Sequence, residues 1–305
     1  MENAPFISLI VPIYGVEAYI EQCALSLMMQ TAQDVEFIFV NDGTPDRSVE
    51  VLENVLKRFP ERRVLLINQA NAGLPRARMA GLNQARGTYI MHLDSDDWLE
   101  PKAVERLSAK ARESGADLIY YDFWKEYGNR SKLDHERAFT PENKTDWMRR
   151  LYRDGAYGYV WCKMVRRELY DGIFTPSYTM HEDVVFSTQL IFRARTIAQL
   201  SVPLVHYRRN NPSASTRSRK AVRRGQMARN YLDMYEFYRN QPDSVPTEIV
   251  ENDLFLRAAY VGFSLDRALF AERPYLKEMA RRLPLMPFHR VLLLQQLFMK
   301  IWLLF

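Results

Sequence analysis

The amino-acid sequence predicts an α/β fold with a doubly wound, mostly parallel sheet, followed by a helical C-terminal region. The first 120 residues alternate short apolar runs with helical patterns, which is typical of such sheets. The apolar runs lack a clean alternation with polar residues, as expected for strands covered on both faces. From Ala221 onward the pattern is helical. With 305 residues, of which 47% are hydrophobic, the chain can bury a large core.

The expected strands are short segments rich in Val, Ile, Leu and aromatic residues. They span Phe6–Ile13, Val35–Val40, Val64–Ile67, Thr88–Leu93, Asp117–Tyr121 and Val202–Arg208. Helices are expected near Ala18–Met29, Arg47–Phe59, Pro75–Arg86, Pro101–Ser114 and Met180–Arg195. Pro75 and Pro101 suit a first helical turn, where a missing N–H costs little. This order of elements predicts parallel pairing among the early strands.

A change in composition near Arg217–Arg224 predicts the main boundary of the chain. We expect an α/β domain over residues 1–216 and a helical region over residues 217–305. The start of the sequence does not read as a signal peptide, and no apolar run approaches the roughly 20 residues that span a bilayer. The two cysteines are not spaced as metal ligands, which fits a reducing compartment. These features predict a cytoplasmic protein.

Two further segments indicate binding partners or contact surfaces. Between His206 and Asn230 there are eight Lys and Arg residues and no acidic residue, within a net charge of +5. This stretch suits nucleic acid, an anionic lipid or a phosphorylated ligand, although a solvated basic face is the ordinary interpretation. Phe288–Phe305 is almost wholly apolar. It predicts either a helix packed in an oligomer or a helix lying on the inner membrane surface.

Carboxylates collect where predicted strands end, at the edge where α/β sheets bind ligands. Asp94, Asp96 and Asp97 directly follow the fourth strand. Three carboxylates this close repel one another unless a cation lies among them. Oxygen ligands suit Mg²⁺ or Mn²⁺, and such an ion can bridge a diphosphate. The cluster therefore predicts a metal site, although Asp97 alone would also serve as a helix-capping residue.

Four motifs in order give the sequence a specific resemblance. They are Val11-Pro12-Ile13-Tyr14, Val40-Asn41-Asp42-Gly43-Thr44-Pro45-Asp46, Asn71-Ala72-Gly73-Leu74-Pro75-Arg76-Ala77-Arg78 and Asp94-Ser95-Asp96-Asp97. Together they closely resemble the family-two inverting glycosyltransferases, whose catalytic domain has the glycosyltransferase A fold. The likeness covers roughly Pro5–Thr216. Two departures are Gly15, where many relatives carry Asn, and Thr44, which replaces the commoner Ser.

The resemblance implies roles for individual residues. The nucleotide and donor would be bound by Pro12, Tyr14, Asp42, Arg78, Asp94 and Ser95. Within this set, Tyr14 would stack on the base and Asp42 would contact the edge of the base, while Asp96 would bind Mn²⁺ or Mg²⁺. Stacking suits this task because every base offers a π-face. The donor would be a nucleotide-diphospho-sugar, most often a UDP-sugar.

Later segments resemble further elements of the same family. In His181-Glu182-Asp183-Val184, the resemblance makes Asp183 the catalytic base and Glu182 its accessory. Acidic residues in a first helical turn also complement the helix dipole, which is the structural alternative. Val160-Trp161-Cys162-Lys163 implies that Trp161 is half a core residue and half a platform for the sugar, and that Lys163 also contacts the sugar or acceptor. His206 would be a second metal ligand or, alternatively, a hydrogen-bonded structural histidine. Arg208 would lie near the diphosphate.

The resemblance implies transfer of a hexosyl or hexosaminyl group to a glycan or lipid-linked acceptor, as in polysaccharide biosynthesis. A sugar-phosphate nucleotidyltransferase is an alternative with a similar fold. It would carry a Gly-rich basic loop after the first strand, which Val11–Gly15 does not provide. A second alternative is a non-enzymatic module that binds nucleic acid or membrane through Arg208–Arg229, although no nucleic-acid partner is expected. The sequence leaves the sugar, the acceptor and the oligomeric state open.

Overall fold

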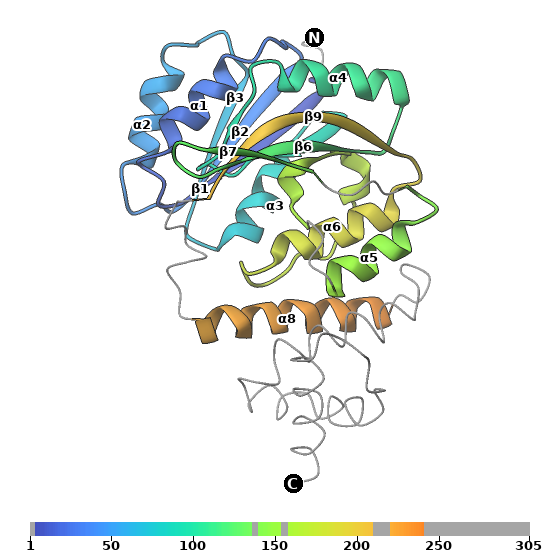
Figure 1. The fold of residues 1–305 in the computed structure, drawn as a ribbon. Helices are drawn as coiled ribbons and strands as arrows, with labels where there is room; N and C mark the ends of the chain where they lie inside the picture. Colours follow the sequence, from blue (N-terminus) through green and yellow to red (C-terminus); the bar gives the residue numbers. More distant parts are fainter. Residues whose placement is uncertain (1–3, 136–139, 154–157, 210–219, 241–305) are drawn as a thin grey trace.

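The structure is a computed structural model that describes residues 4–135, 140–153, 158–209 and 220–240 (Figure 1). The predicted helix Phe288–Phe305 lies outside the described residues, as does part of the basic stretch that begins at His206. The helical interpretation from Ala221 onward is confirmed over Lys220–Arg239, and the rest of that region also lies outside. No helix among the described residues has both the length and the apolar character needed to cross a membrane.

The core of the fold is one nine-stranded mixed sheet. Its strands are β1 Ile7–Ile13, β2 Val35–Asp42, β3 Val64–Gln69, β4 Tyr89–His92, β5 Trp98–Leu99, β6 Leu118–Glu126, β7 Ser131–Asp134, β8 Lys163–Arg166 and β9 Ile197–Arg208. Their order across the sheet is β3-β2-β1-β4-β8-β6-β9-β5, with β7 paired to β6. The six predicted strands are all present, and the α/β prediction is confirmed.

Helices cover both faces of the sheet (Figure 1). They are α1 Ile20–Met28, α2 Ser48–Leu56, α3 Leu74–Gln84, α4 Ala103–Ser114, α5 Lys144–Arg153, α6 Glu182–Arg193 and α8 Lys220–Arg239. Two short 3-10 turns, Val160–Cys162 and Arg167–Tyr170, flank β8. Because both faces are covered, the central strands are buried along their whole length, which explains why their sequences do not alternate.

The apolar core has one part on each face of the sheet. Along β1, Leu9 and Val11 pack with α1, α2 and α4, whereas Ile10 packs with α3, α6 and α8. Residues of α8, including Tyr231 and Tyr235, belong to the second of these clusters. The first helix beyond the predicted boundary at residue 216 is therefore packed into the same core as the sheet. In Figure 1, α8 lies below α5 and α6, on the side of the sheet that carries α3.

Three strands were not predicted from the sequence. The pairs β1–β2, β1–β4, β2–β3 and β6–β9 are parallel, whereas β4–β8, β6–β8, β5–β9 and β6–β7 are antiparallel. β8 and β7 have four residues and β5 has two, so none of them carries a periodic signal. Their existence depends on long-range pairing: β5, for example, pairs Trp98 with His206.

Candidate active site

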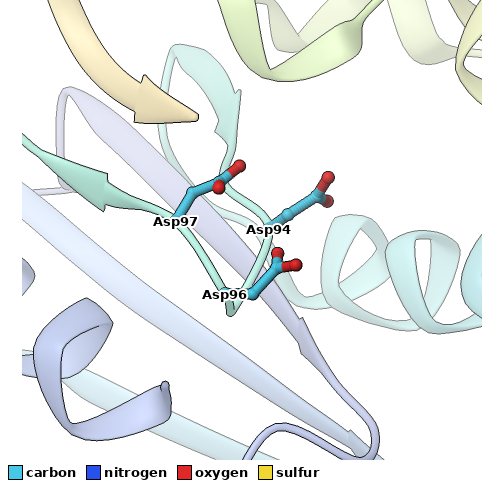
Figure 2. A group of neighbouring side chains, drawn as sticks. All are labelled: Asp94, Asp96 and Asp97. Carbon is cyan, nitrogen blue, oxygen red and sulfur yellow. The ribbon is translucent and has the colours of Figure 1, made fainter. Parts of the chain in front are cut away.

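The predicted metal cluster forms one tight turn between β4 and β5. Asp94, Asp96 and Asp97 have carboxylate oxygens that all lie within 4.8 Å of one another. Figure 2 shows that the three side chains come from this turn and point to the same side of it. The turn is closed by the Asp97 N–H, which donates to the carbonyl oxygen of Asp94 at 3.0 Å. Ser95 is buried within the same turn.

Asp97 is the buried member of the cluster. Burial, reinforced by the charges of Asp96 and Asp94, raises the pKa of the Asp97 carboxyl well above its ordinary value. Its Oδ1 accepts a hydrogen bond from the backbone N–H of Arg208 at 2.8 Å, whereas its Oδ2 is buried without a hydrogen-bond partner. An unsatisfied carboxylate oxygen beside two further carboxylates fits a site for a hard cation.

Arg78 connects the aspartate turn to the predicted catalytic pair. The guanidinium, on α3, is buried and donates from Nη2 to Asp94 Oδ1 at 2.7 Å and from Nε to Glu182 Oε1 at 3.2 Å. Burial alone would lower the pKa of Arg78, but the charges of Asp94 and Glu182 outweigh it and raise the pKa. Nη1 is buried without a hydrogen-bond partner. The site therefore offers one buried donor group to an anionic ligand.

Glu182 and Asp183 begin α6, as the sequence predicts. The Asp183 N–H donates to Glu182 Oε2 at 2.7 Å, and the Val184 N–H donates to Asp183 Oδ1 at 2.8 Å. Burial raises the pKa of both carboxyl groups, while the positive charge of Arg78 opposes that rise. A carboxylate whose pKa is raised toward neutral pH is better suited to accept a proton.

Asp42 organises the loop that leads into α3. Its Oδ1 accepts from Gln69 Nε2 at 2.7 Å and from the Ala72 N–H at 2.8 Å, and its Oδ2 accepts from the Gly73 N–H at 2.9 Å. Gly73 has φ 86°, a left-handed conformation that glycine adopts without strain. Asp42 thus fixes the start of the helix that carries Arg78, and its contact with a base edge stays a prediction.

The predicted base-stacking residue lies at the end of β1. Tyr14 is 46% exposed, whereas Pro12 is buried in the strand. The loop after Tyr14 is fixed by Thr44, whose Oγ1 accepts from the Gly15 N–H at 2.9 Å and donates to Asp46 Oδ1 at 2.7 Å. The Thr44 hydroxyl makes both of these contacts, so a threonine at this position still closes the loop. Tyr14 has the exposure that stacking on a ligand requires.

The structure corrects the role expected for Trp161. This side chain is only 2% exposed, stacks on Tyr159 at 4.6 Å and contacts Phe123 edge to face. A ring enclosed in this way is a core residue, and it does not present a platform to a sugar. Lys163 is also buried, and its Nζ donates to the Tyr159 carbonyl oxygen at 2.6 Å. Its positive charge nevertheless lowers the pKa of Asp183 slightly, against the larger effect of burial.

His206 adopts the structural arrangement of the two that the sequence left open. Its Nδ1 lies 2.7 Å from Glu126 Oε1 and its Nε2 lies 3.1 Å from Glu100 Oε1, and its ring stacks on Trp98. Both ring nitrogens thus contact glutamates, and His206 is not part of the aspartate cluster. A metal ion at His206 would have to displace one of these contacts, so we do not propose His206 as a ligand.

Arg208, two residues later on β9, does contact the aspartate turn. Its Nε donates to the Asp96 carbonyl oxygen at 3.0 Å, in addition to the backbone contact with Asp97.

One further residue at the site, His92, was not singled out from the sequence. Burial and the charge of Arg78 lower its pKa well below the ordinary value, and its Nδ1 lacks a hydrogen-bond partner. The sequence does contain a signal for this residue, because His92 ends an apolar strand two positions before Asp94.

Comparisons with known proteins identify the family of the chain. The profile of Glycosyl transferase family 2 matches residues 8–174. The chain is 34% identical to the uncharacterized glycosyltransferase EpsJ of Bacillus subtilis over 242 residues, which cover 77% of this chain and 70% of EpsJ. It is 31% identical to the “Putative glycosyltransferase EpsH” of the same organism, over 72% of this chain and 65% of EpsH. Neither alternative function receives support from these relatives.

Solved structures confirm the fold. S. aureus TarS 1–349 in complex with UDP-GlcNAc has a TM-score of 0.69 and 18% identity, over 97% of this chain and 88% of that chain. The mannosyltransferase PcManGT from Pyrobaculum calidifontis, in complex with GDP-Man and Mn²⁺, has a TM-score of 0.55 and 12% identity, over 98% of this chain and 88% of that chain. The glycosyltransferase A fold expected from the resemblance is thus confirmed, and the chain belongs to glycosyltransferase family 2.

Proposed function

We propose that this chain is an inverting enzyme that transfers a hexosyl or hexosaminyl group from a nucleotide-diphospho-sugar to a hydroxyl group of a glycan or lipid-linked acceptor. The observation that carries the proposal is the double contact of Arg78. This guanidinium joins Asp94, in the turn that follows β4, to Glu182, which precedes Asp183 in α6. A donor-binding carboxylate and a candidate base are thereby held at one edge of the sheet, where α/β folds bind their ligands.

The aspartate turn fits a divalent cation. Asp96 is the proposed ligand, with Asp94 and Asp97 beside it, and the partnerless Oδ2 of Asp97 gives the site an oxygen that nothing else in the described structure satisfies. Mn²⁺ or Mg²⁺ bound there would neutralise negative charge on a diphosphate. The mannosyltransferase with a similar fold was solved with Mn²⁺, which supports the choice of metal class.

The donor is proposed to lie between the end of β1 and the aspartate turn. Tyr14 supplies an exposed ring for the base, and Asp42 holds the adjacent loop. Nη1 of Arg78 is a buried hydrogen-bond donor that suits a phosphate or sugar oxygen. The structural neighbours carry UDP-GlcNAc or GDP-Man, so a nucleotide-sugar is the appropriate ligand class. We propose a UDP-sugar as the first candidate.

In the proposed reaction, Asp183 accepts the proton of the acceptor hydroxyl group while the oxygen of that hydroxyl attacks the anomeric carbon. A new carbon–oxygen bond forms while the bond to the diphosphate breaks, and the nucleoside diphosphate leaves with the electron pair. Attack from the face opposite the leaving group inverts the anomeric carbon. Glu182 stays paired with Arg78 and holds the start of α6. The raised pKa of Asp183 suits a proton acceptor near neutral pH.

A thermal-shift panel followed by product analysis tests this proposal. UDP-N-acetylglucosamine, UDP-glucose, UDP-galactose and GDP-mannose are compared with Mn²⁺ present. A true donor at 100 times its Kd should stabilise the protein by about 2.7 kcal/mol. NMR of the product or of the released sugar should then show the anomeric configuration opposite to that of the donor. A product that retains the configuration would contradict the proposed single displacement.

The cytoplasmic location and the membrane contact of Phe288–Phe305 stay predictions.

A further inference from the structure

The residue before the catalytic pair has an unusual backbone conformation. His181 has φ 62°, the left-handed region, and it is the one residue other than glycine with positive φ among those that the structure describes. A non-glycine residue holds this conformation only when its surroundings stabilise it. His181 caps α6, so its conformation sets the direction in which Glu182 and Asp183 leave the preceding loop.

A tyrosine from α8 contacts the His181 side chain. Tyr231 Oη lies 2.6 Å from His181 Nδ1, and the two rings meet edge to face at 5.7 Å. Tyr231 is 1% exposed and His181 is half-buried, so the hydrogen bond is partly shielded from water. The two residues are separated by 50 positions in the sequence. A partly buried hydrogen bond of this kind favours one orientation of the histidine and, through it, one conformation of the helix start.

The neighbouring residue on α8 holds the loop itself. Asn230 is completely buried, and its Oδ1 accepts from the Tyr178 N–H at 3.1 Å. Its Nδ2 donates to the carbonyl oxygens of Tyr178 at 2.7 Å and Met180 at 2.8 Å. All three hydrogen bonds therefore go to the backbone that leads into His181. Adjacent residues of one helix thus fix both the loop and its last side chain.

We infer that Asn230 and Tyr231 are positioning residues for Glu182 and Asp183, an inference that rests on the function proposed above. Arg78 holds the pair from the side of the sheet, and α8 holds the preceding loop from the opposite side. A base displaced by about 1 Å can lose about 100-fold in rate, so the second attachment matters for turnover. The helix α8 then helps to position the catalytic centre.

Tyr231→Phe is the mildest test, because it removes only the hydroxyl group. The matched control is Tyr238→Phe, in the same helix, where the hydroxyl is equally buried but has no hydrogen-bond partner. We expect kcat to fall about tenfold in Tyr231→Phe, with little change in donor KM and with a shifted acid limb of the pH profile. Tyr238→Phe should match the unmodified protein. The assay follows release of nucleoside diphosphate from the donor identified by the thermal-shift panel.

Asn230→Ala tests the loop more strongly, with Gln189→Ala as its control. Gln189 is also a buried amide with three hydrogen bonds to backbone groups, but these involve Phe174, near the far end of the loop before α6, and Val185, instead of the residues 178–180 that lead directly into His181. We expect kcat to fall up to about 100-fold in Asn230→Ala and much less in Gln189→Ala at similar loss of stability. Hydrogen exchange of the peptide 175–186 should become faster in Asn230→Ala and Tyr231→Phe, without any ligand.

The outcomes separate this inference from the proposed function. If Asp183→Asn abolishes turnover while Tyr231→Phe and Asn230→Ala retain normal kcat and pH profiles, the positioning role is wrong and the proposed base stands. If both α8 variants lose kcat only in proportion to stability, as their controls do, the role is structural and the inference is also wrong. Normal turnover in Asp183→Asn overturns the base assignment itself.

Discussion

Arg78 and Glu182 are separated by 104 positions in the sequence, yet Nε of the first lies 3.2 Å from Oε1 of the second in the interior of the protein. The same guanidinium donates a hydrogen bond to Asp94, so a single side chain joins the aspartate turn to the start of α6. A buried cation between two carboxylates makes the geometry of the site depend on charge balance as well as on packing.

Replacing Arg78 should therefore affect folding and function together. Arg78→Met leaves Asp94 and Glu182 without their partner, and we expect unfolding free energy to fall by about 3–5 kcal/mol in urea titrations. Arg112→Met is the control, because its pair with Asp34 is substantially exposed, and it should cost less than about 1 kcal/mol. Equal losses in the two variants would show that the buried bridge has no special role.

Asp183→Asn should separate chemistry from binding. The amide keeps the size of the side chain and removes its ability to accept a proton, so transfer should fall by roughly 10²–10⁴-fold. The thermal shift produced by donor and Mn²⁺ should persist, because Asp183 is not among the clustered aspartates. Near-normal turnover would reduce Asp183 to an acid that complements the α6 dipole.

Activity and stability should respond to pH in opposite directions. Burial raises the pKa of Asp183, so kcat should decline as acid protonates the base, beginning at a higher pH than for an ordinary aspartate. A carboxyl whose folded pKa is raised contributes stability below its unfolded pKa of about 4, and that contribution is lost as pH rises through the folded pKa. Melting temperatures between about pH 4 and 7, a range that contains both the unfolded pKa and the folded pKa of about 6, should depend less on pH in Asp183→Asn when EDTA is present. An unchanged dependence would exclude Asp183 as its source.

Removal of the metal should mimic loss of Asp96. With Mn²⁺, UDP should stabilise the unmodified protein, and EDTA or Asp96→Ala should abolish that stabilisation because the diphosphate would then face unneutralised carboxylates. Glu113→Ala, which alters a well-exposed acid on α4, is the control and should retain the full shift. UDP affinity that survives both EDTA and Asp96→Ala would show that the turn does not hold a metal needed for nucleotide binding.

Two helical glycines should respond oppositely to alanine. In α3, a Cβ at Gly81 would lie 2.5 Å from Ile10 Cγ2, so Gly81→Ala should destabilise the protein by about 1–3 kcal/mol through overpacking. In α8, a Cβ at Gly225 would meet nothing within 4 Å among the residues that the structure describes. Gly225→Ala should stabilise by about 0.5–1 kcal/mol, because alanine favours a helix interior. Urea unfolding of both variants checks the prediction, and a stabilised Gly81→Ala would contradict the packing between α3 and β1.

The sequence predicts best those features of the fold and the site that neighbouring residues in the chain determine. The aspartate turn and the start of α6 could be located because strand, turn and helix signals lie within a few residues of each chemical group. Trp161 shows the limit: its burial depends on Phe123 and Tyr207, which no local pattern associates with it. His206 was ambiguous for the same reason, since Glu100 and Glu126 approach it only when β5, β6 and β9 pair. Asn230 looked like any polar residue of a helix.

Because β8 lies between β4 and β6, the strands of the sheet cannot all pair in the order in which the ribosome makes them. β4 and β6 are made early, but neither can pair with the other, and both wait for Lys163–Arg166 to fill the gap. β5 waits longer, because its partners are Val205 and His206. The ribosome thus makes Asp94 through Asp97 before the first third of the chain is finished, and one flank of that turn gains its partner strand only about a hundred residues later. These carboxylates are therefore synthesised about a hundred residues before the strand that pairs beside their turn.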